Sequence, residues 1–123
     1  MTSVHRVLVV DDDAAIRGLV AAVLRRKSLT VDEAVNGREA IDRLEQQEYA
    51  AVVVDLMMPI VSGFEVVDYL QEKRPTTPCV VVISAAAPAV IRTVEENPVV
   101  RAVLRKPFDI SELVTAVLQC VNS

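Results

Sequence analysis

Polar side chains that could do chemistry follow four separate apolar runs in this sequence. The runs "VLVV", "VVV", "VVI" and "VVRAVLR" are followed by Asp11, Asp12 and Asp13, by Asp55, by Ser84 and by Lys106, in that order. Crowded carboxylates repel one another unless a cation joins them, and oxygen ligands with open positions suit Mg²⁺. A carboxylate can also attack phosphorus, while an ammonium group neutralises charge on the transferring group. Brought together, these residues would form a magnesium-dependent phosphoryl site.

Five runs rich in β-branched residues predict the strands that would position these groups. They cover residues 7–10, 29–35, 51–54, 79–83 and 99–104. Three of them are nearly all apolar, which is typical of strands buried on both faces of a parallel sheet.

Helical spacing of apolar residues fills the segments between the runs. The first helix has an apolar face of Ile16, Leu19, Val20, Val23 and Leu24, and the last has one of Ile110, Leu113, Val114, Val117, Leu118 and Val121. Shorter helices are expected at about 38–46, 64–73 and 88–96. Pro88 suits a first turn and Asn97-Pro98 an end, while Asn36-Gly37 predicts a turn.

Five alternating strands and helices joined by short loops predict a doubly wound α/β sandwich with right-handed crossovers. We expect residues 1–123 to form a single domain. The carboxyl ends of parallel strands lie on one edge of the sheet, where ligands bind. The four polar groups should therefore converge there.

Each group also has an ordinary structural interpretation. We expect Asp13 to cap the helix that follows it. Asp55 could form a turn, Ser84 could cap a helix, and Lys106 could be a solvated loop charge. Their coincidence at four strand ends favours a common site.

The composition excludes several classes of protein. The chain has 123 residues, is 52% hydrophobic and carries a net charge of −4, so it presents no basic surface for nucleic acid or an anionic membrane. No apolar run approaches the roughly 20 residues of a transmembrane helix, and "MTSVHRVLVV" is too short for a signal peptide. Cys79 and Cys120 lie far apart and outside any CxxC pair, so we expect reduced thiols in a cytoplasmic protein.

The sequence resembles the receiver domains of two-component response regulators, including the single-domain chemotaxis type. The resemblance runs from about Arg6 to Val121 and rests on "VLVVDDD", "VVVDLMMPIVSGFE", "VVISA" and "VLRKPFD". The family spacing is met by Asp55, Met58, Pro59 and Gly63, and by Lys106-Pro107-Phe108. The resemblance implies a flavodoxin-like (βα)5 sandwich whose five-stranded sheet has the order 2-1-3-4-5.

The resemblance also implies roles for the phosphoryl-binding residues. Asp55 resembles the phosphoacceptor, and Ser84 resembles the switch hydroxyl that reaches toward the attached phosphoryl group. Lys106 resembles the ammonium that contacts a phosphoryl oxygen, and its bond to Pro107 is expected to be cis.

A Mg²⁺ site is implied beside them. Asp12 would bind the ion directly, Asp11 through water, and Asp55 and the backbone carbonyl of Met57 would be further ligands. Pro59 and Gly63 would shape the loop, with Gly63 giving backbone freedom before the third helix.

The implied partners are a sensor histidine kinase or a histidine phosphotransfer protein. A downstream protein would bind the face made by the fourth helix, fifth strand and fifth helix, with no direct contact to nucleic acid or membrane. The protein would be a monomer or weak dimer, and its catalysis would be limited to accepting the phosphoryl group and slowly hydrolysing it.

The sequence departs from the family at a few positions. Val103 stands where the family usually has Tyr or Phe, which puts the usual switch coupling in doubt. "ENPVVRA" replaces the common Gly-Ala-Asp stretch. Met57 and Ala86 occupy positions that tune phosphoryl lifetime, and neither side chain can act as an acid or base.

Three other functions compete. A Mg²⁺-dependent aspartyl-phosphate phosphohydrolase would need a second acid where Met57 stands. An unphosphorylated pseudo-receiver would not need the acidic residues, Ser84 and Lys106. A flavodoxin-like cofactor binder would need a phosphate loop after the first strand.

Overall fold

The computed structural model describes residues 5–73 and 78–122, and strands and helices alternate along them as the sequence predicts. The strands are β1 (Arg6–Val10), β2 (Thr30–Ala34), β3 (Ala51–Asp55), β4 (Cys79–Ser84) and β5 (Val100–Arg105). The helices are α1 (Ala14–Arg25), α2 (Gly37–Gln46), α3 (Gly63–Lys73), α4 (Pro88–Glu95) and α5 (Ile110–Val121). The described residues do not include residues 1–4, which begin the segment that was compared with a signal peptide. They also leave out residue 123, the last residue of the expected domain.

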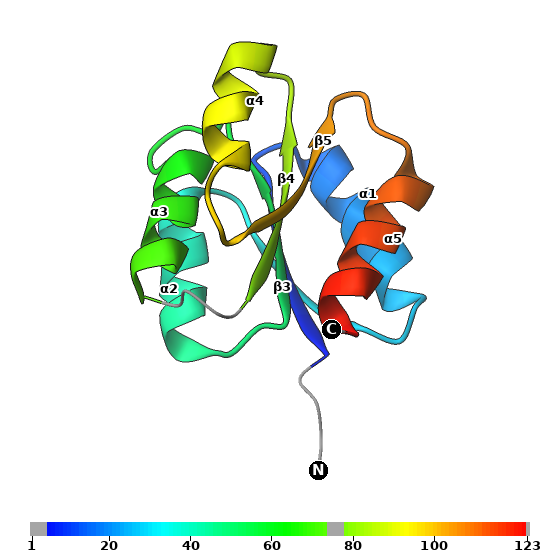
Figure 1. Ribbon diagram of the computed structural model, residues 1–123. Helices are drawn as coiled ribbons and strands as arrows, with labels where there is room; N and C mark the ends of the chain where they lie inside the picture. Colours follow the sequence, from blue (N-terminus) through cyan, green and yellow to red (C-terminus); the bar gives the residue numbers. More distant parts are fainter. Residues whose placement is uncertain (1–4, 74–77, 123) are drawn as a thin grey trace.

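The strands form one parallel sheet in the order β2-β1-β3-β4-β5, which confirms the predicted fold class. Helices α1 and α5 cover one face, and α2, α3 and α4 cover the other (Figure 1). From β1 the chain runs outward to β2 and then returns to β3 on the other side of β1. Strand order therefore reverses between β1 and β3, and their carboxyl ends flank the crevice where doubly wound sheets bind ligands.

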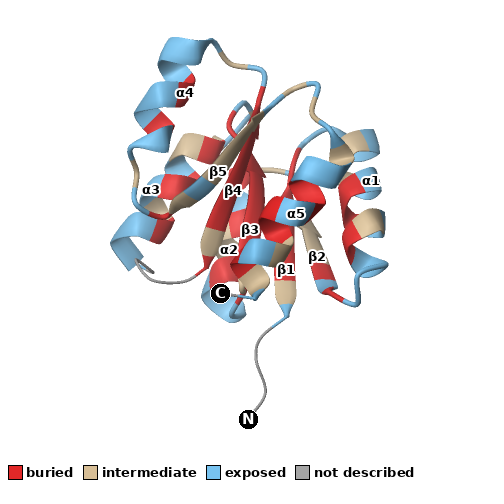
Figure 2. Cartoon of the chain, turned by 45° about the vertical axis from the view of Figure 1, so that its right-hand side comes forward, coloured by how far each residue is buried: buried red, intermediate tan, exposed pale blue. Residues whose placement is uncertain are grey.

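The central strands are the most deeply buried part of the molecule (Figure 2). All five residues of β3 and the last four of β1 are buried. Two apolar layers enclose them, one packed under α1 and α5 and the other under α2, α3 and α4. Burial of a valine side chain stabilises the fold by roughly 1.5–3 kcal/mol, so a group at the end of either strand sits on rigid backbone.

One residue of the predicted apolar face of α1 points away from the core. Leu19 is 55% exposed, whereas Ala21 is fully buried. Residues two positions apart on a helix point in nearly opposite directions, so when Ala21 faces the sheet Leu19 faces solvent. The predicted face was right for Val20 and Leu24 and wrong for Leu19.

The cysteines form a disulfide, so the prediction of two reduced thiols is wrong. Helix α5 runs back against the direction of the strands and brings Cys120 beside Cys79 at the start of β4. Their Cα atoms are 5.6 Å apart, which lies in the usual range for a disulfide. The two cysteines are 41 positions apart in sequence, so the sequence pattern did not reveal this proximity.

Across residues 5–73 and 78–122, no helix combines the length and apolar character needed to span a membrane.

Candidate functional site

Three carboxylates meet at the carboxyl edge of the sheet, as the strand ends predicted. Asp11 follows β1, Asp12 follows Asp11, and Asp55 ends β3, and one oxygen from each lies within 4.8 Å of the others. Asp11 and Asp55 are buried, whereas Asp12 is exposed. We refer to these three residues as the acidic cluster.

Lys106 places an ammonium group against the acidic cluster. Its Nζ lies 2.9 Å from Asp55 Oδ2 and 3.3 Å from Asp11 Oδ2. Burial would lower the pKa of Lys106, but its hydrogen bond to Asp55 and the charges of Asp55 and Asp11 outweigh burial and raise it. The lysine is therefore held as a cation, and one positive charge faces three carboxylates.

The pKa of Asp11 shows how poorly one cation satisfies this cluster. Burial raises it most, and the nearby charge of Asp55 raises it further. The backbone amide of Asp13, which donates to Asp11 Oδ1 at 2.9 Å, and the Lys106 ammonium offset only part of this. The ionised form of Asp11 is thus disfavoured in the fold, and a second cation would relieve it.

Asp55 is held from both sides. Its Oδ2 accepts from Lys106, and its Oδ1 accepts a hydrogen bond of 3.1 Å from the backbone amide of Met57. The residue is only 4% exposed. The fully buried strand β3 beneath it fixes its backbone, so the carboxylate presents a defined oxygen at the rim of the crevice.

The loop after Asp55 depends on a close approach at Gly63. A Cβ at Gly63 would meet the backbone oxygen of Asp55 and the Cα of Leu56, so α3 begins directly against the end of β3. The prediction that Gly63 supplies backbone freedom is wrong, because its φ is not positive. The left-handed residue of this loop is Ile60, with φ of 69° and 77% exposure.

Asn36-Gly37 begins α2 instead of forming a separate turn. Asn36 is the N-cap, and its side chain accepts a hydrogen bond of 2.8 Å from the amide of Glu39. A Cβ at Gly37 would collide with the backbone of Val61, whose oxygen accepts from the Gly37 amide at 2.9 Å. The loop before α2 therefore packs on the loop that follows Asp55.

Asp13 has the capping role that the sequence predicted. Its Oδ1 accepts hydrogen bonds from the amides of Ala15, at 2.9 Å, and Ile16, at 3.1 Å, and it stands at the N-cap of α1. This bonding separates Asp13 from the acidic cluster and leaves two acids of the "DDD" run facing the site.

Ser84 is buried at the same edge, at the end of β4. Its Oγ accepts a hydrogen bond of 2.9 Å from the amide of Ala86, and its carbonyl accepts one of 2.8 Å from the amide of Lys106. The N-cap of α4 is Ala87, so Ser84 does not cap that helix. The expected cis bond between Lys106 and Pro107 is present.

The positions that depart from the family lie around this edge. Val103 pairs with Val82 in the sheet and packs, partly buried, against the core under α2, α3 and α4. The Met57 side chain is 59% exposed, and Ala86 is half-buried.

Arg17 is a residue near the acidic cluster that the sequence analysis missed. Its Nη1 donates a hydrogen bond of 2.9 Å to the backbone oxygen of Asp11, and its Nε lies 3.1 Å from Glu33 Oε1 on β2. The available signal was an arginine one helical turn after Asp13, on a helix whose first turn faces the strand ends.

The donor set fits a hard divalent cation. The acidic cluster offers only oxygen atoms from three side chains, and the exposed Asp12 leaves open positions for water or a phosphate oxygen. Mg²⁺ prefers such sites and keeps several waters. Burial and the nearby charge of Asp55 raise the pKa of Asp11, and a bound cation would stabilise its ionised form.

Comparison with known proteins places this geometry in a family. The sequence model of the response regulator receiver domain matches residues 7–118. The chain belongs to the response regulator receiver domain family. Members of this family are phosphorylated on an aspartate, bind Mg²⁺ at an acidic cluster, and interact with histidine kinases or phosphotransfer proteins.

Curated relatives support the assignment. The transcriptional regulatory protein TcrA of Mycobacterium tuberculosis is 35% identical over 108 residues, which cover 88% of this chain and 42% of TcrA. ResD of Bacillus subtilis is 43% identical over 75 residues, 61% of this chain and 31% of ResD. The chain thus spans less than half the length of these relatives.

Solved structures agree with the fold. A CheY-like receiver domain protein from Methanospirillum hungatei superposes with a TM-score of 0.89 at 22% identity, covering 98% of this chain and 95% of that one. The response regulator TrrA of Thermotoga maritima, solved in complex with Mg²⁺-BeF, gives 0.83 at 28% identity over 94% of this chain and 97% of TrrA.

Proposed function

We propose that Asp55 is the phosphoacceptor of a single receiver domain formed by residues 1–123. The observation that carries this proposal is the placement of Asp55 at the end of the buried strand β3, with Lys106 Nζ at 2.9 Å and the other two acids within 4.8 Å. An Asp55 oxygen would attack the phosphorus of a phosphohistidine. The O–P bond forms as the P–N bond breaks, and the imidazole nitrogen keeps the bonding electron pair.

The surrounding residues would share the charge of this transfer. Asp12 would bind Mg²⁺ directly and Asp11 through water, with Asp55 and the Met57 carbonyl completing the protein ligands. The ion would supply electrostatic stabilisation to the phosphoryl oxygens. Lys106 would contact a phosphoryl oxygen from the other side.

Ser84 would be the switch that reports the phosphoryl group. Phosphorylation adds charge and acceptor oxygens at Asp55, and the Ser84 hydroxyl lies at the neighbouring strand end. A shift of Ser84 would disturb the hydrogen bonds that it accepts from the amides of Ala86 and Lys106. These bonds lead into α4 and β5, so we propose the α4-β5-α5 face as the surface that binds a downstream protein.

The proposed setting follows from this chemistry. A sensor histidine kinase or a histidine phosphotransfer protein would donate the phosphoryl group, in the cytoplasm, to a monomer or weak dimer. The domain would hydrolyse its own phosphoryl group slowly and act on no other substrate, because Met57 cannot serve as the acid–base group of a phosphohydrolase.

Intact-mass analysis after incubation with acetyl phosphate and Mg²⁺ tests the proposal. We expect the wild-type chain to gain one phosphoryl group and Asp55→Asn to gain none. Asp68→Asn, at an exposed position of α3, is the matched control and should be labelled like the wild type. Undiminished labelling of Asp55→Asn would assign the acceptor role to another residue.

A further inference from the structure

We propose that Arg17 is a positioning residue that orients the Asp11–Asp12 peptide and thereby sets the affinity of the domain for Mg²⁺. This inference rests on the proposed function of the acidic cluster as a Mg²⁺ site. It assigns a role to a helix side chain that contacts neither the ion nor the phosphoryl group.

The contact is made to the backbone between the two acids. Arg17 Nη1 donates a hydrogen bond of 2.9 Å to the carbonyl oxygen of Asp11, and that carbonyl belongs to the peptide that joins Asp11 to Asp12. The side chain of Arg17 is only 17% exposed. Rotation of this peptide would move both carboxylates, so the arginine fixes the direction in which the exposed Asp12 leaves the turn.

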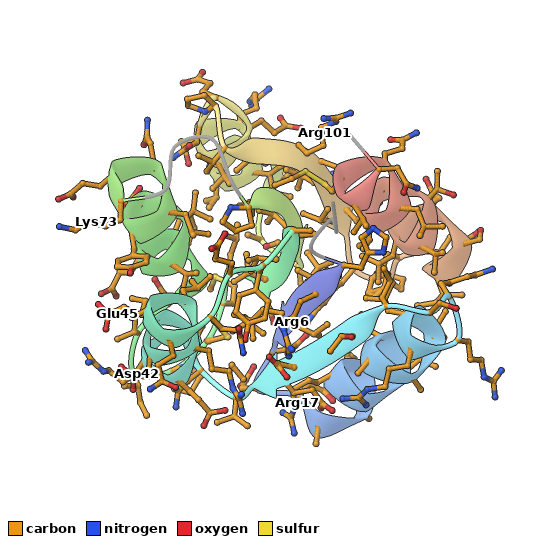
Figure 3. All side chains as sticks on the ribbon, turned by 90° about the horizontal axis from the view of Figure 1, so that it is seen from below. Arg6, Arg17, Asp42, Glu45, Lys73 and Arg101 are labelled. Atoms are coloured by element: carbon orange, nitrogen blue, oxygen red, sulfur yellow. A yellow bond between two sulfur atoms is a disulfide. The ribbon has the colours of Figure 1, made fainter. Side chains whose placement is uncertain are left out.

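A second contact keeps the guanidinium group in place. Arg17 Nε lies 3.1 Å from Glu33 Oε1 on the neighbouring strand β2, and Figure 3 shows Arg17 on α1 beside that strand. The planar guanidinium group can use two donors at once in a fixed geometry. It therefore links the Asp11 carbonyl to the Glu33 side chain on β2.

The charge of Arg17 and its orienting role predict opposite changes in Mg²⁺ affinity when the residue is replaced. A positive charge beside the acidic cluster repels Mg²⁺, so removing it should strengthen binding if only charge mattered. Glu33, 3.1 Å from Arg17 Nε, offsets part of this repulsion. Loss of orientation, in contrast, should weaken binding. The direction of the change in affinity thus separates the two explanations.

Arg25 offers a matched control on the same helix. Its Nη2 lies 3.4 Å from Glu33 Oε2 and donates a hydrogen bond of 2.9 Å to the backbone oxygen of Val31. Arg25 shares the carboxylate partner of Arg17, but its backbone contact is to β2. Replacing Arg25 removes a different ion pair of the same Glu33 carboxylate and leaves the hydrogen bond to the Asp11 carbonyl in place.

The test is a titration of the full chain with MgCl₂, followed by the amide NMR signals of Asp12, Asp13 and Met57. Loss of a group that orients a metal ligand typically costs 10–100-fold in affinity, and we expect about tenfold for Arg17→Gln, because Mg²⁺ keeps several waters. Arg25→Gln should change the affinity by less than about twofold. Arg17→Lys, which retains one donor, should recover part of the loss.

The rate of phosphorylation by acetyl phosphate gives a second readout. For Arg17→Gln, saturating Mg²⁺ should restore the wild-type rate, since the defect lies in binding the ion. Thermal unfolding shows whether Arg17→Gln is folded. If it is not, Arg17→Lys takes its place in the titration. A Mg²⁺ affinity of Arg17→Lys equal to that of the wild type would then overturn the proposal.

Other outcomes are also decisive. Unchanged or tighter Mg²⁺ binding by Arg17→Gln overturns the positioning role, as does an equal loss in Arg25→Gln, which would place the effect in the Glu33 ion pair. Failure of the proposed function looks different: the wild type would not bind Mg²⁺, or Asp12→Ala would bind it equally well.

Discussion

Buried or partly buried aspartates occur in two clusters of this domain, and the two clusters differ in how many hydrogen-bond donors and cations they supply. The acidic cluster crowds three carboxylates around the single ammonium group of Lys106. Toward the opposite edge, Asp32 of β2 accepts hydrogen bonds from the Tyr49 hydroxyl at 2.6 Å and from Arg6 Nη1 at 3.2 Å. We call Arg6, Asp32 and Tyr49 the tyrosine cluster. Its one carboxylate has two donors, whereas the acidic cluster has more acceptors than cations.

The pKa shifts of Asp32 and Asp11 follow this difference in the number of donors and cations around each carboxylate. In the tyrosine cluster, burial would raise the pKa of Asp32, but the hydrogen bonds from Tyr49 and Arg6 outweigh it and lower the pKa. In the acidic cluster, burial and the Asp55 charge prevail and raise the pKa of Asp11. A carboxylate with enough hydrogen-bond donors stabilises the fold. A carboxylate with too few donors lowers the stability of the fold and favours the binding of a cation.

The largest effect on stability is expected in the tyrosine cluster. Asp32→Ala leaves the Tyr49 hydroxyl and the Arg6 guanidinium group without their shared acceptor, and we expect a loss of about 2 kcal/mol in the free energy of unfolding. Urea denaturation measures it. Asp42→Ala, which removes an exposed pair with Arg38, is the control and should cost only a few tenths of a kcal/mol. If Asp32→Ala and Asp42→Ala lost equal free energy of unfolding, the hydrogen bonds of Asp32 would be no more stabilising than an exposed ion pair.

A smaller effect of opposite sign is expected in the acidic cluster. Asp11→Asn keeps the shape of the side chain and removes a buried charge, so it should raise the free energy of unfolding by about 1 kcal/mol at pH 7 without Mg²⁺. The gain should shrink when Mg²⁺ is added to both proteins, because the ion should bind the wild type more tightly than the variant and so stabilise it more. Destabilisation of Asp11→Asn without Mg²⁺ would mean that Lys106 already satisfies the cluster.

The dependence of stability on pH sharpens the comparison further. The folded pKa of Asp32 is lowered, so its stabilisation is complete above the ordinary value of 3.8 and is lost as pH falls through the lower folded value. The stability difference between wild type and Asp32→Asn should therefore narrow in acid. Urea denaturation of both proteins between about pH 3 and 6 measures this stability difference. A difference that widens in acid would contradict a lowered pKa of Asp32 in the fold.

Much of this arrangement could be predicted from the sequence because it depends on local patterns. Apolar runs located the five strands, and the rule that parallel strands end at one edge brought Asp11, Asp12 and Asp55 together. The capping role of Asp13 follows from its place before a helix, and the structure bears it out.

The features that escaped prediction depend on contacts between distant segments. The Cys79–Cys120 disulfide requires knowledge of where α5 ends in space. The role of Gly63 lies in its distance from the Asp55 backbone, and that of Arg17 in the reach of a long side chain to a carbonyl oxygen. The orientation of Leu19 depends on how α1 is rotated against the sheet. Sequence patterns do not encode such distances.

The central claim is that the acidic cluster is the phosphoryl site and that the tyrosine cluster only stabilises the fold. Amide NMR spectra of the chain with and without beryllofluoride and Mg²⁺, a stable mimic of the phosphoryl group, test it most directly. We predict large shifts at Asp12, Ser84 and Lys106, smaller ones along residues 85–94, and unmoved signals in the tyrosine cluster. The shifts that depend on beryllofluoride, beyond those caused by Mg²⁺ alone, should be lost in Asp55→Asn. Shifts centred on the tyrosine cluster, or the same response in Asp55→Asn, would contradict the account.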